Sequence, residues 1–176
     1  YGLKIKTLIK NFLLVFVFIY FIFFMSSNLS IMISDFFLYR SREPILYLSQ
    51  EEVKALYWLR DNSKIDGVIL THQLRGNFIP GLIGRTVYAG HDVETLIYDR
   101  KIREIKWFFE DDSEENKKAD FLQINRIDYI FYGDLEKKLG TFNPDKKNYL
   151  KLIYPVSSKT YGVDKNSKTE IYRVMD

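Results

Sequence analysis

Residues 12–25 read FLLVFVFIYFIFFM, an unbroken run of apolar and aromatic side chains. The run belongs to a longer stretch, residues 11–34, in which no residue carries a charge. About 20 apolar residues in a helix, which rises about 1.5 Å per residue, cross the hydrocarbon core of a membrane. A helix also satisfies its backbone hydrogen bonds internally, as the bilayer requires. We therefore expect residues 11–34 to form a transmembrane helix, followed by a connector at residues 35–48.

Positive charges lie on one side of this stretch. Lys4, Lys6 and Lys10 precede it with no acidic residue among them, whereas Asp35 follows it directly. Positively charged flanks stay in the cytoplasm, so we expect residues 1–10 to be a cytoplasmic flank and the carboxyl-terminal part to be extracytoplasmic. A cleaved signal peptide is the competing interpretation. The apolar run is longer than a typical signal core, however, and no Ala-x-Ala-like site follows it.

The charge balance argues against nucleic-acid binding. The chain has 26 Lys and Arg residues and 23 Asp and Glu residues, and three of the cations precede the apolar run, which leaves 23 of each sign. The net charge of +3 thus belongs to the short flank, and the rest of the chain has no excess of basic residues to bind a phosphate backbone. Cysteine is absent, which excludes disulfides and thiolate metal sites.

Residues 49–176 alternate strand and helix patterns, as is typical of an α/β domain. Ser49 and Glu52 have the spacing of a helix capping box. The predicted strands are 67–71, 85–89, 127–132, 149–156 and 169–174, and the predicted helices are 50–62, 96–110 and 114–125. In the last of these helices Leu122 and Ile124 are expected to face the core. The last two strands flank a polar turn, which predicts an antiparallel hairpin.

The predicted architecture is one N-terminal transmembrane helix followed by a single extracytoplasmic α/β domain, residues 49–176. Its sheet is expected to be mixed and mainly parallel, covered by helices and closed by a C-terminal β-hairpin. The string SREP at residues 41–44 should separate the two parts, because proline disfavours helical geometry in the residue before it.

Reactive side chains are most concentrated in GRTVYAGHDVET, residues 84–95. His91, Asp92 and Glu94 can bind a cation or act as acid and base, and Arg85 can pair with a phosphate. The string leaves a predicted strand through a glycine into a loop, where open α/β sheets place binding groups. The competing interpretation is structural, with these side chains holding the loop by hydrogen bonds.

His72 follows the first predicted strand and is expected at the same edge of the sheet as His91. Two histidines without an obvious third ligand favour a backbone-capping role for His72 over a metal site. The sequence contains no phosphate-loop motif and no serine-nucleophile motif. Trp58 and Trp107 can stack on sugars, but their helical spacing is typical of core residues. We expect no catalytic residue, no metal site and no cofactor in this chain.

The order of these motifs resembles the carboxyl-terminal exported region of prokaryotic multi-pass membrane proteins that look like glycosyltransferases of the GT-C superfamily. The similar stretches are ALYWLRDN (55–62), GVILT (67–71), IPGLIGR (79–85), VYAGH (87–91) and IDYIF (127–131). The most specific part is Gly-Arg-x-Val-Tyr-x-Gly-His-x-x-Glu-Thr. The resemblance covers most of the chain after the apolar run.

Enzymes of that superfamily take sugars from polyprenyl-phosphate carriers at the outer face of the membrane. The resemblance implies that this chain is the exported tail of such an enzyme, and its start at Tyr1 rather than Met leads us to expect further spans upstream. The family's catalytic acidic residue lies in the first exported loop, outside this sequence, so no catalytic residue is carried over.

The implied substrate-binding candidates are Arg85, His91, Glu94 and Thr95, with His72 as a further candidate. The expected partners are the lipid bilayer, the upstream membrane domain of the same protein, and a polyprenyl-phosphate sugar or glycan; nucleic acid is not among them. The alternative is a membrane-tethered, non-catalytic module that recognises a glycan or a partner protein.

Overall fold

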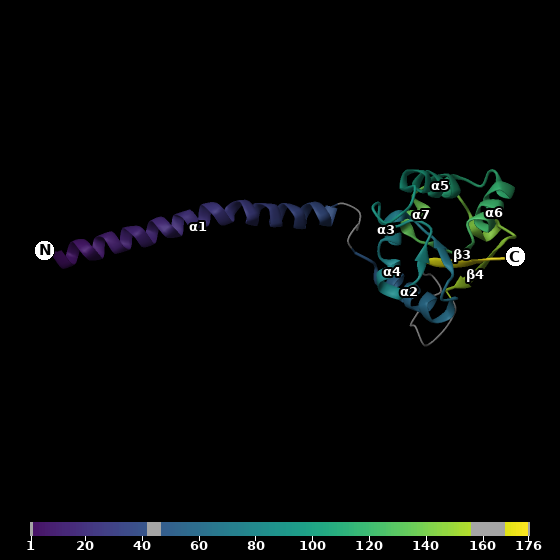
Figure 1. Cartoon of the computed structure of the whole chain (residues 1–176), viewed down its shortest axis with the longest axis horizontal. Helices are drawn as coiled ribbons and strands as arrows, with labels where there is room; N and C mark the ends of the chain where they lie inside the picture. The colour runs from purple at the N-terminus through teal and green to yellow at the C-terminus, as the bar shows by residue number, and fades with distance from the viewer. Residues whose placement is uncertain (1, 42–46, 156–167, 176) are drawn as a thin grey trace. The chain divides into compact units, whose positions relative to one another are not determined.

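The computed structural model describes residues 2–41, 47–155 and 168–175, and the chain divides into two compact units, Tyr1–Tyr47 and Leu48–Asp176 (Figure 1). The first unit consists of helix α1 (Gly2–Ser41), which contains residues 11–34 and continues past them. Its segment Ile5–Ser34 is long and apolar enough to cross a membrane and is not buried against other parts of the chain. By length and composition, α1 is therefore a membrane anchor or a signal segment. The break predicted at residues 41–44 lies outside the described residues, except for Ser41.

The second unit is built on a five-stranded mixed sheet with the strand order β2-β1-β3-β5-β4. Its strands are β1 (Val68–Leu70), β2 (Thr86–Val87), β3 (Ile127–Tyr132), β4 (Leu150–Tyr154) and β5 (Glu170–Val174). Strand β1 pairs in parallel with β2 and β3, whereas β5 is antiparallel to β3 and β4. The predicted α/β fold with a mixed sheet and a C-terminal hairpin is confirmed, and the pairings among the described strands divide evenly between parallel and antiparallel.

Helices connect and cover these strands. They are α2 (Gln50–Asn62), α3 (Gln73–Gly76), α4 (Ile79–Ile83), α5 (Tyr98–Glu110), α6 (Glu115–Ile124) and α7 (Asp134–Lys137), with a 3₁₀ turn at Pro144–Lys146. The capping box of α2 is confirmed: the Glu52 amide donates to the Ser49 hydroxyl at 3.2 Å, and the Ser49 amide donates to the Glu52 carboxylate at 2.8 Å. These bonds satisfy amide groups that have no partner within the helix.

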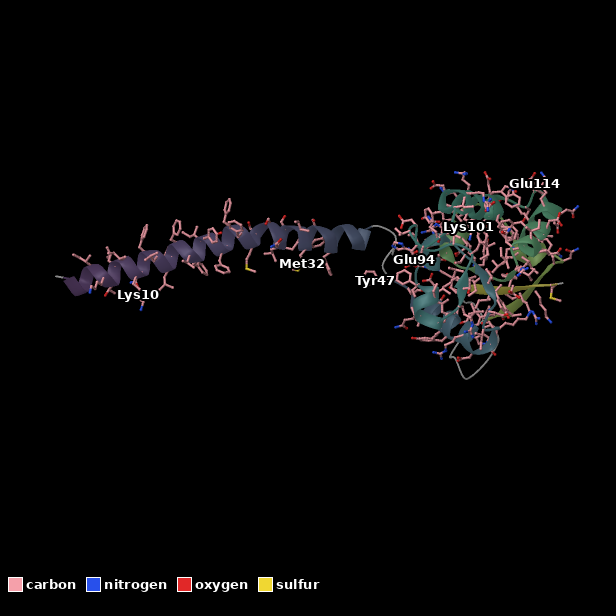
Figure 2. All side chains as sticks on the ribbon, in the orientation of Figure 1. Lys10, Met32, Tyr47, Glu94, Lys101 and Glu114 are labelled. Carbon is pink, nitrogen blue, oxygen red and sulfur yellow. The ribbon has the colours of Figure 1, made fainter. Side chains whose placement is uncertain are left out.

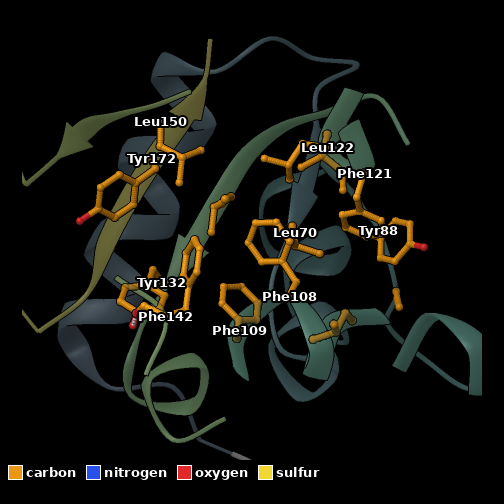
Figure 3. Packing of buried hydrophobic residues seen from close by; sticks show 14 residues of the cluster. Leu70, Tyr88, Phe108, Phe109, Phe121, Leu122, Tyr132, Phe142, Leu150 and Tyr172 are labelled. Atoms are coloured by element: carbon orange, nitrogen blue, oxygen red, sulfur yellow. Dashed lines mark hydrogen bonds between the residues drawn. The ribbon is translucent and has the colours of Figure 1, made fainter. Parts of the chain in front are cut away.

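Strand β3 supplies the core on both faces of the sheet because successive side chains of a strand point to opposite sides. Tyr129 and Phe131 join the cluster formed with α2 and α4, which includes Leu56, Leu59, Ile79 and Ile83. Ile130 and Tyr132 join the cluster formed with α5 and α6, which includes Phe108, Phe109, Phe121 and Leu122 (Figure 3). The sheet is therefore covered by helices on both faces.

The prediction that Ile124 of helix α6 faces the core is wrong. Ile124 is 79 % exposed, whereas Lys118 of the same helix is fully buried. The Lys118 Nζ donates to the Asp111 carbonyl at 2.6 Å and lies 5.6 Å from the centre of the Trp107 ring. A long lysine stem can cover apolar surface while its ammonium group contacts polar partners at the edge. A pattern of apolar residues in the sequence does not indicate that such a lysine is buried.

Candidate functional site

A cleft of about 790 Å³ opens at the end of β2, beside α3, α4 and the loop that leads to α5. Strands β1 and β2 are parallel, so the cleft lies at the carboxyl-terminal edge of the sheet, where α/β folds place their binding sites. Its volume is within the range of small-molecule sites. Four of the five predicted site residues line it, namely Arg85, His91, Glu94 and Thr95, whereas His72 does not.

Two glycines allow the backbones beside the cleft to touch. A Cβ atom on Gly76, at the end of α3, would lie 2.1 Å from the Ala89 carbonyl oxygen, and one on Gly90 would lie 2.8 Å from the Gly76 oxygen. No side chain fits at either position without backbone movement. The glycine that precedes His91 is thus required by the close approach of α3 to the strand end.

Thr95 holds the loop that carries His91 and Glu94. The Gly90 amide donates to the Thr95 hydroxyl at 3.1 Å, and the Thr95 amide donates to the His91 carbonyl at 2.9 Å. The Glu94 amide also donates to the His91 carbonyl, at 3.2 Å. These bonds close residues 90–95 into a turn, so Thr95 has a structural role in addition to lining the cleft.

His91 is exposed and uses one ring nitrogen for its contacts. Its Nδ1 lies 3.3 Å from the Val93 amide, which can donate to a neutral ring, and 3.1 Å from the Asp92 carboxylate, which can accept from a protonated ring. The two contacts belong to different protonation states of the same atom. In either state Nε2 has no hydrogen-bond partner among the described residues and is available to a ligand.

Arg85 fastens one wall of the cleft to the end of α2. Its guanidinium donates to the Arg60 carbonyl at 2.6 Å, to the Ser63 hydroxyl at 3.0 Å and to the Ser63 carbonyl at 3.4 Å. Carbonyls at a helix end lack intrahelical partners, and Arg85 supplies one. A phosphate at this guanidinium would have to compete with these bonds, so the structure gives Arg85 a positioning role.

His72 caps α3 instead of lining the cleft. Its Nδ1 accepts a hydrogen bond from the Leu74 amide at 3.2 Å. This arrangement is the capping role that the sequence favoured.

Glu94 adds a negative charge to the cleft, and Lys101 adds a positive charge to that of Arg85; Figure 2 labels Glu94 and Lys101. The Glu94 carboxylate is exposed and has no side-chain partner within the described part of the chain. The Lys101 Nζ donates to the Tyr88 carbonyl at 2.8 Å, and burial lowers the pKa of this ammonium group. Sequence reasoning missed Lys101, although it lies one turn before the buried Ile105 on the inward face of α5.

Sequence reasoning also missed a buried ion pair beside the cleft. The Arg75 Nε lies 2.5 Å from the Glu52 carboxylate, and both side chains are almost completely buried. Arg75 precedes the glycine at the cleft floor, and Glu52 is the capping-box residue of α2. The pair therefore ties α3 to the start of α2.

Glu136 forms a second buried polar centre after β1 and β3. Its carboxylate accepts hydrogen bonds from the Thr71 hydroxyl at 2.7 Å, the His72 amide at 2.6 Å and the Gly133 amide at 2.8 Å. Burial raises the pKa of Glu136, and it outweighs these three hydrogen bonds, which lower the pKa. The side chain thus connects the carboxyl ends of the two parallel strands.

The cleft can hydrogen-bond a ligand rich in hydroxyl groups, because it offers an acceptor in Glu94, a donor in Lys101 and either in His91. No group of three or more His, Cys, Asp or Glu side chains in residues 2–41, 47–155 and 168–175 could hold a metal ion. Trp58 and Trp107 do not line the cleft: Trp58 is buried beside Tyr154, and the Trp107 Nε1 donates to Glu114 at 2.8 Å. The hydrogen-bonding side chains that line the cleft therefore support ligand binding there.

Comparison with known proteins finds no matching family model and no matching curated protein. Among solved structures, the chain is similar to the C-terminal globular domain of an oligosaccharyltransferase from Archaeoglobus fulgidus. The sequence identity is 12 %, the TM-score is 0.48, and the match covers 73 % of this chain and 99 % of that chain.

Proposed function

We propose that this chain is the exported, carboxyl-terminal part of a membrane glycosyltransferase that uses a polyprenyl-phosphate sugar, and that it is not catalytic by itself. The observation that carries the proposal is the cleft, which gathers His91, Glu94 and Lys101 at the carboxyl-terminal edge of the sheet. The sequence string that contains His91 and Glu94 is also the most specific part of the resemblance to such enzymes.

The cleft suits a sugar for chemical reasons. A sugar hydroxyl both donates and accepts hydrogen bonds, so a carboxylate, an imidazole and an ammonium group within one cleft can each engage it. The ammonium of Lys101 can also meet a phosphate oxygen. In this proposal Glu94 and His91 contact the sugar of the donor or of the acceptor, and Arg85 and Thr95 keep the wall of the cleft in place.

The proposed topology follows from the apolar helix and its lysines. Residues 11–34 span the membrane, the flank with Lys4, Lys6 and Lys10 stays in the cytoplasm, and the α/β domain faces the outside. The catalytic acid belongs to an upstream membrane domain of the same protein in this proposal, and the cleft presents the substrate to it.

The test is sugar transfer by the full-length protein in proteoliposomes, with a radiolabelled polyprenyl-phosphate monosaccharide as donor. Glu94→Ala and His91→Ala should each raise KM for donor or acceptor roughly tenfold, the loss expected for one charged hydrogen bond, while the amount of protein in the membrane stays unchanged. Glu110→Ala is the matched control, because Glu110 is also an exposed glutamate but lies at the other end of α5, outside the cleft. It should leave transfer unchanged.

Two outcomes would overturn the proposal. If transfer falls only in step with protein abundance, the loop merely holds the domain together. If both variants transfer sugar normally, the cleft does not serve transfer. Binding of a free glycan to the chain would then support a tethered binding module.

A further inference from the structure

Lys101 is the cation of the cleft that is free to donate to a ligand. The guanidinium of Arg85, the other cation of the cleft, is already bonded to Arg60 and Ser63. Within the described residues the Lys101 Nζ makes one hydrogen bond, to the Tyr88 carbonyl at 2.8 Å, so further protons of this ammonium group are left for a ligand. The groups that hold Lys101 charged and in place therefore matter to the cleft.

The aromatic ring of Tyr88 also contacts this ammonium group. The Lys101 Nζ lies 4.6 Å from the centre of the ring, within the range of cation–π attraction. The Tyr88 side chain is buried and packs edge-on against Phe121, with 5.3 Å between the two ring centres. The ring and the carbonyl of one buried residue thus fix the position of the Lys101 ammonium group.

Glu104 is linked to Lys101 although it does not line the cleft. It follows Lys101 by three residues on α5, so the two side chains are on the same face of the helix. The Glu104 carboxylate accepts a hydrogen bond from the Tyr88 hydroxyl, which orients the ring that contacts Lys101. A phenol that donates to a carboxylate also has a more electron-rich ring, and such a ring attracts a cation more strongly.

The charged neighbours of Lys101 act in opposite directions. Burial has the largest influence and lowers the pKa of Lys101, Glu104 raises this pKa, and Arg100 lowers it. Arg100 also pairs with Glu104 at 3.4 Å. The other ionisable side chains that line the cleft do not contribute to the shift, namely Arg85, His91 and Glu94. Among the described residues, Glu104 is therefore the carboxylate that opposes loss of the Lys101 charge.

We propose that Glu104 is a positioning residue that keeps Lys101 charged and in place at the cleft. Glu104 acts directly through its own charge and indirectly through the Tyr88 ring. This action on Lys101 does not require the proposed function. Its consequence does rest on that function: the charged Lys101 donates to the ligand of the cleft.

The test measures the pKa of Lys101 by NMR on the full chain in detergent micelles. Lysine that is isotope-labelled at Cε reports each titration, and the signal that disappears in Lys101→Arg is assigned to Lys101. Glu104→Gln should lower the pKa of Lys101, whereas Arg100→Gln should raise it, because each variant removes one of two opposing charges. Glu110→Gln is the matched control, since Glu110 is the exposed last residue of the same helix, and it should leave this pKa unchanged.

Two results would overturn the proposal. An unchanged pKa of Lys101 in Glu104→Gln would show that Glu104 does not act on Lys101. A shift in the same direction in Glu104→Gln and Arg100→Gln would show that the two variants disturb the local fold instead of the charge balance.

The consequence for the cleft is tested separately, in the sugar-transfer assay. KM should rise by roughly tenfold, the loss expected for one charged hydrogen bond, as the pH passes the pKa of Lys101. Glu104→Gln should move this rise to lower pH. If the pKa moves and KM does not follow it, Lys101 does not contact the ligand and its part in the cleft is overturned. The proposed function is still tested by the variants of Glu94 and His91, so the two failures can be told apart.

Discussion

At the scale of single residues, the contact of Gly76 with Ala89 sets the floor of the cleft. We predict that Gly76→Ala lowers the free energy of unfolding by about 1–3 kcal/mol, because the new methyl group must displace backbone. Unfolding can be followed by tryptophan fluorescence, since both tryptophans, Trp58 and Trp107, lie in the domain. Gly81→Ala is the control: a Cβ atom there meets nothing within 4 Å, and alanine favours the helix. Equal destabilisation by both variants would contradict the close contact.

A second prediction at this scale concerns Glu136 and pH. Because burial raises its pKa above the ordinary 4.5, the folded protein keeps this proton to higher pH than the unfolded chain does. Its contribution to stability is therefore complete below pH 4.5 and is lost as the pH rises through the raised pKa. The loss amounts to about 1.4 kcal/mol for each pH unit that separates the pKa of the folded protein from that of the unfolded chain.

Glu136→Gln should flatten this decline in melting temperature above pH 4.5, measured by the same fluorescence. The variant should also be less stable at every pH, because its amide group would face one of the donors Thr71, His72 or Gly133. The comparison therefore uses the slope with pH. An unchanged slope would show that Glu136 is not the titrating group.

The candidate site was only partly predictable at the residue scale. The string at residues 84–95 identified the cleft wall because its polar residues directly follow a strand. The ion pair of Glu52 and Arg75 was not predictable, since its members are 23 residues apart. Glu52 is already explained by the capping box of α2, and Arg75 is a basic residue in the last turn of α3. A structural role for Arg85 was one of the two interpretations left open, but its acceptors were not predictable for the same reason, since they lie 22 and 25 residues earlier.

At the scale of elements, the junction between the cleft loop and α5 contains Ile97, one of three non-glycine residues with positive φ in the described part of the chain. We predict that Ile97→Asn raises the free energy of unfolding by about 1 kcal/mol, because asparagine tolerates the left-handed conformation and little packing is lost. Arg126→Asn is the control, since Arg126 is exposed and has a φ of 53°. Both variants should be more stable in denaturant titrations. No gain from either would show that these backbones are not strained.

Elements were predictable where local chemistry alone defines them. The capping box of α2 and the bounds of β3 match the prediction, because a cap depends on residues three positions apart and β3 is largely apolar and aromatic. Helix α5 begins at Tyr98 instead of residue 96 because Ile97 is left-handed. Strand β2 covers only Thr86 and Val87, since the chain then turns toward Gly76. Such contacts with residues distant in the sequence cannot be predicted from the residues around a strand.

At the scale of the whole molecule, the proposed topology can be tested directly. Asp66→Cys introduces the chain's only cysteine at an exposed position of the domain, and Lys6→Cys does so in the flank before the span. On intact cells, a membrane-impermeant thiol reagent should label the first variant and spare the second until the cells are lysed. The reverse pattern would place the domain in the cytoplasm.

The position of β5 within the sheet has a consequence for biosynthesis. This strand lies between β3 and β4, yet residues 170–174 leave the ribosome after all the other described strands. Until they emerge, β3 has an open edge and the aromatic side chains around Tyr132 lack their neighbour Tyr172. The domain cannot complete its core stepwise during translation, and it must remain in a partly open form that is vulnerable to aggregation until β5 inserts.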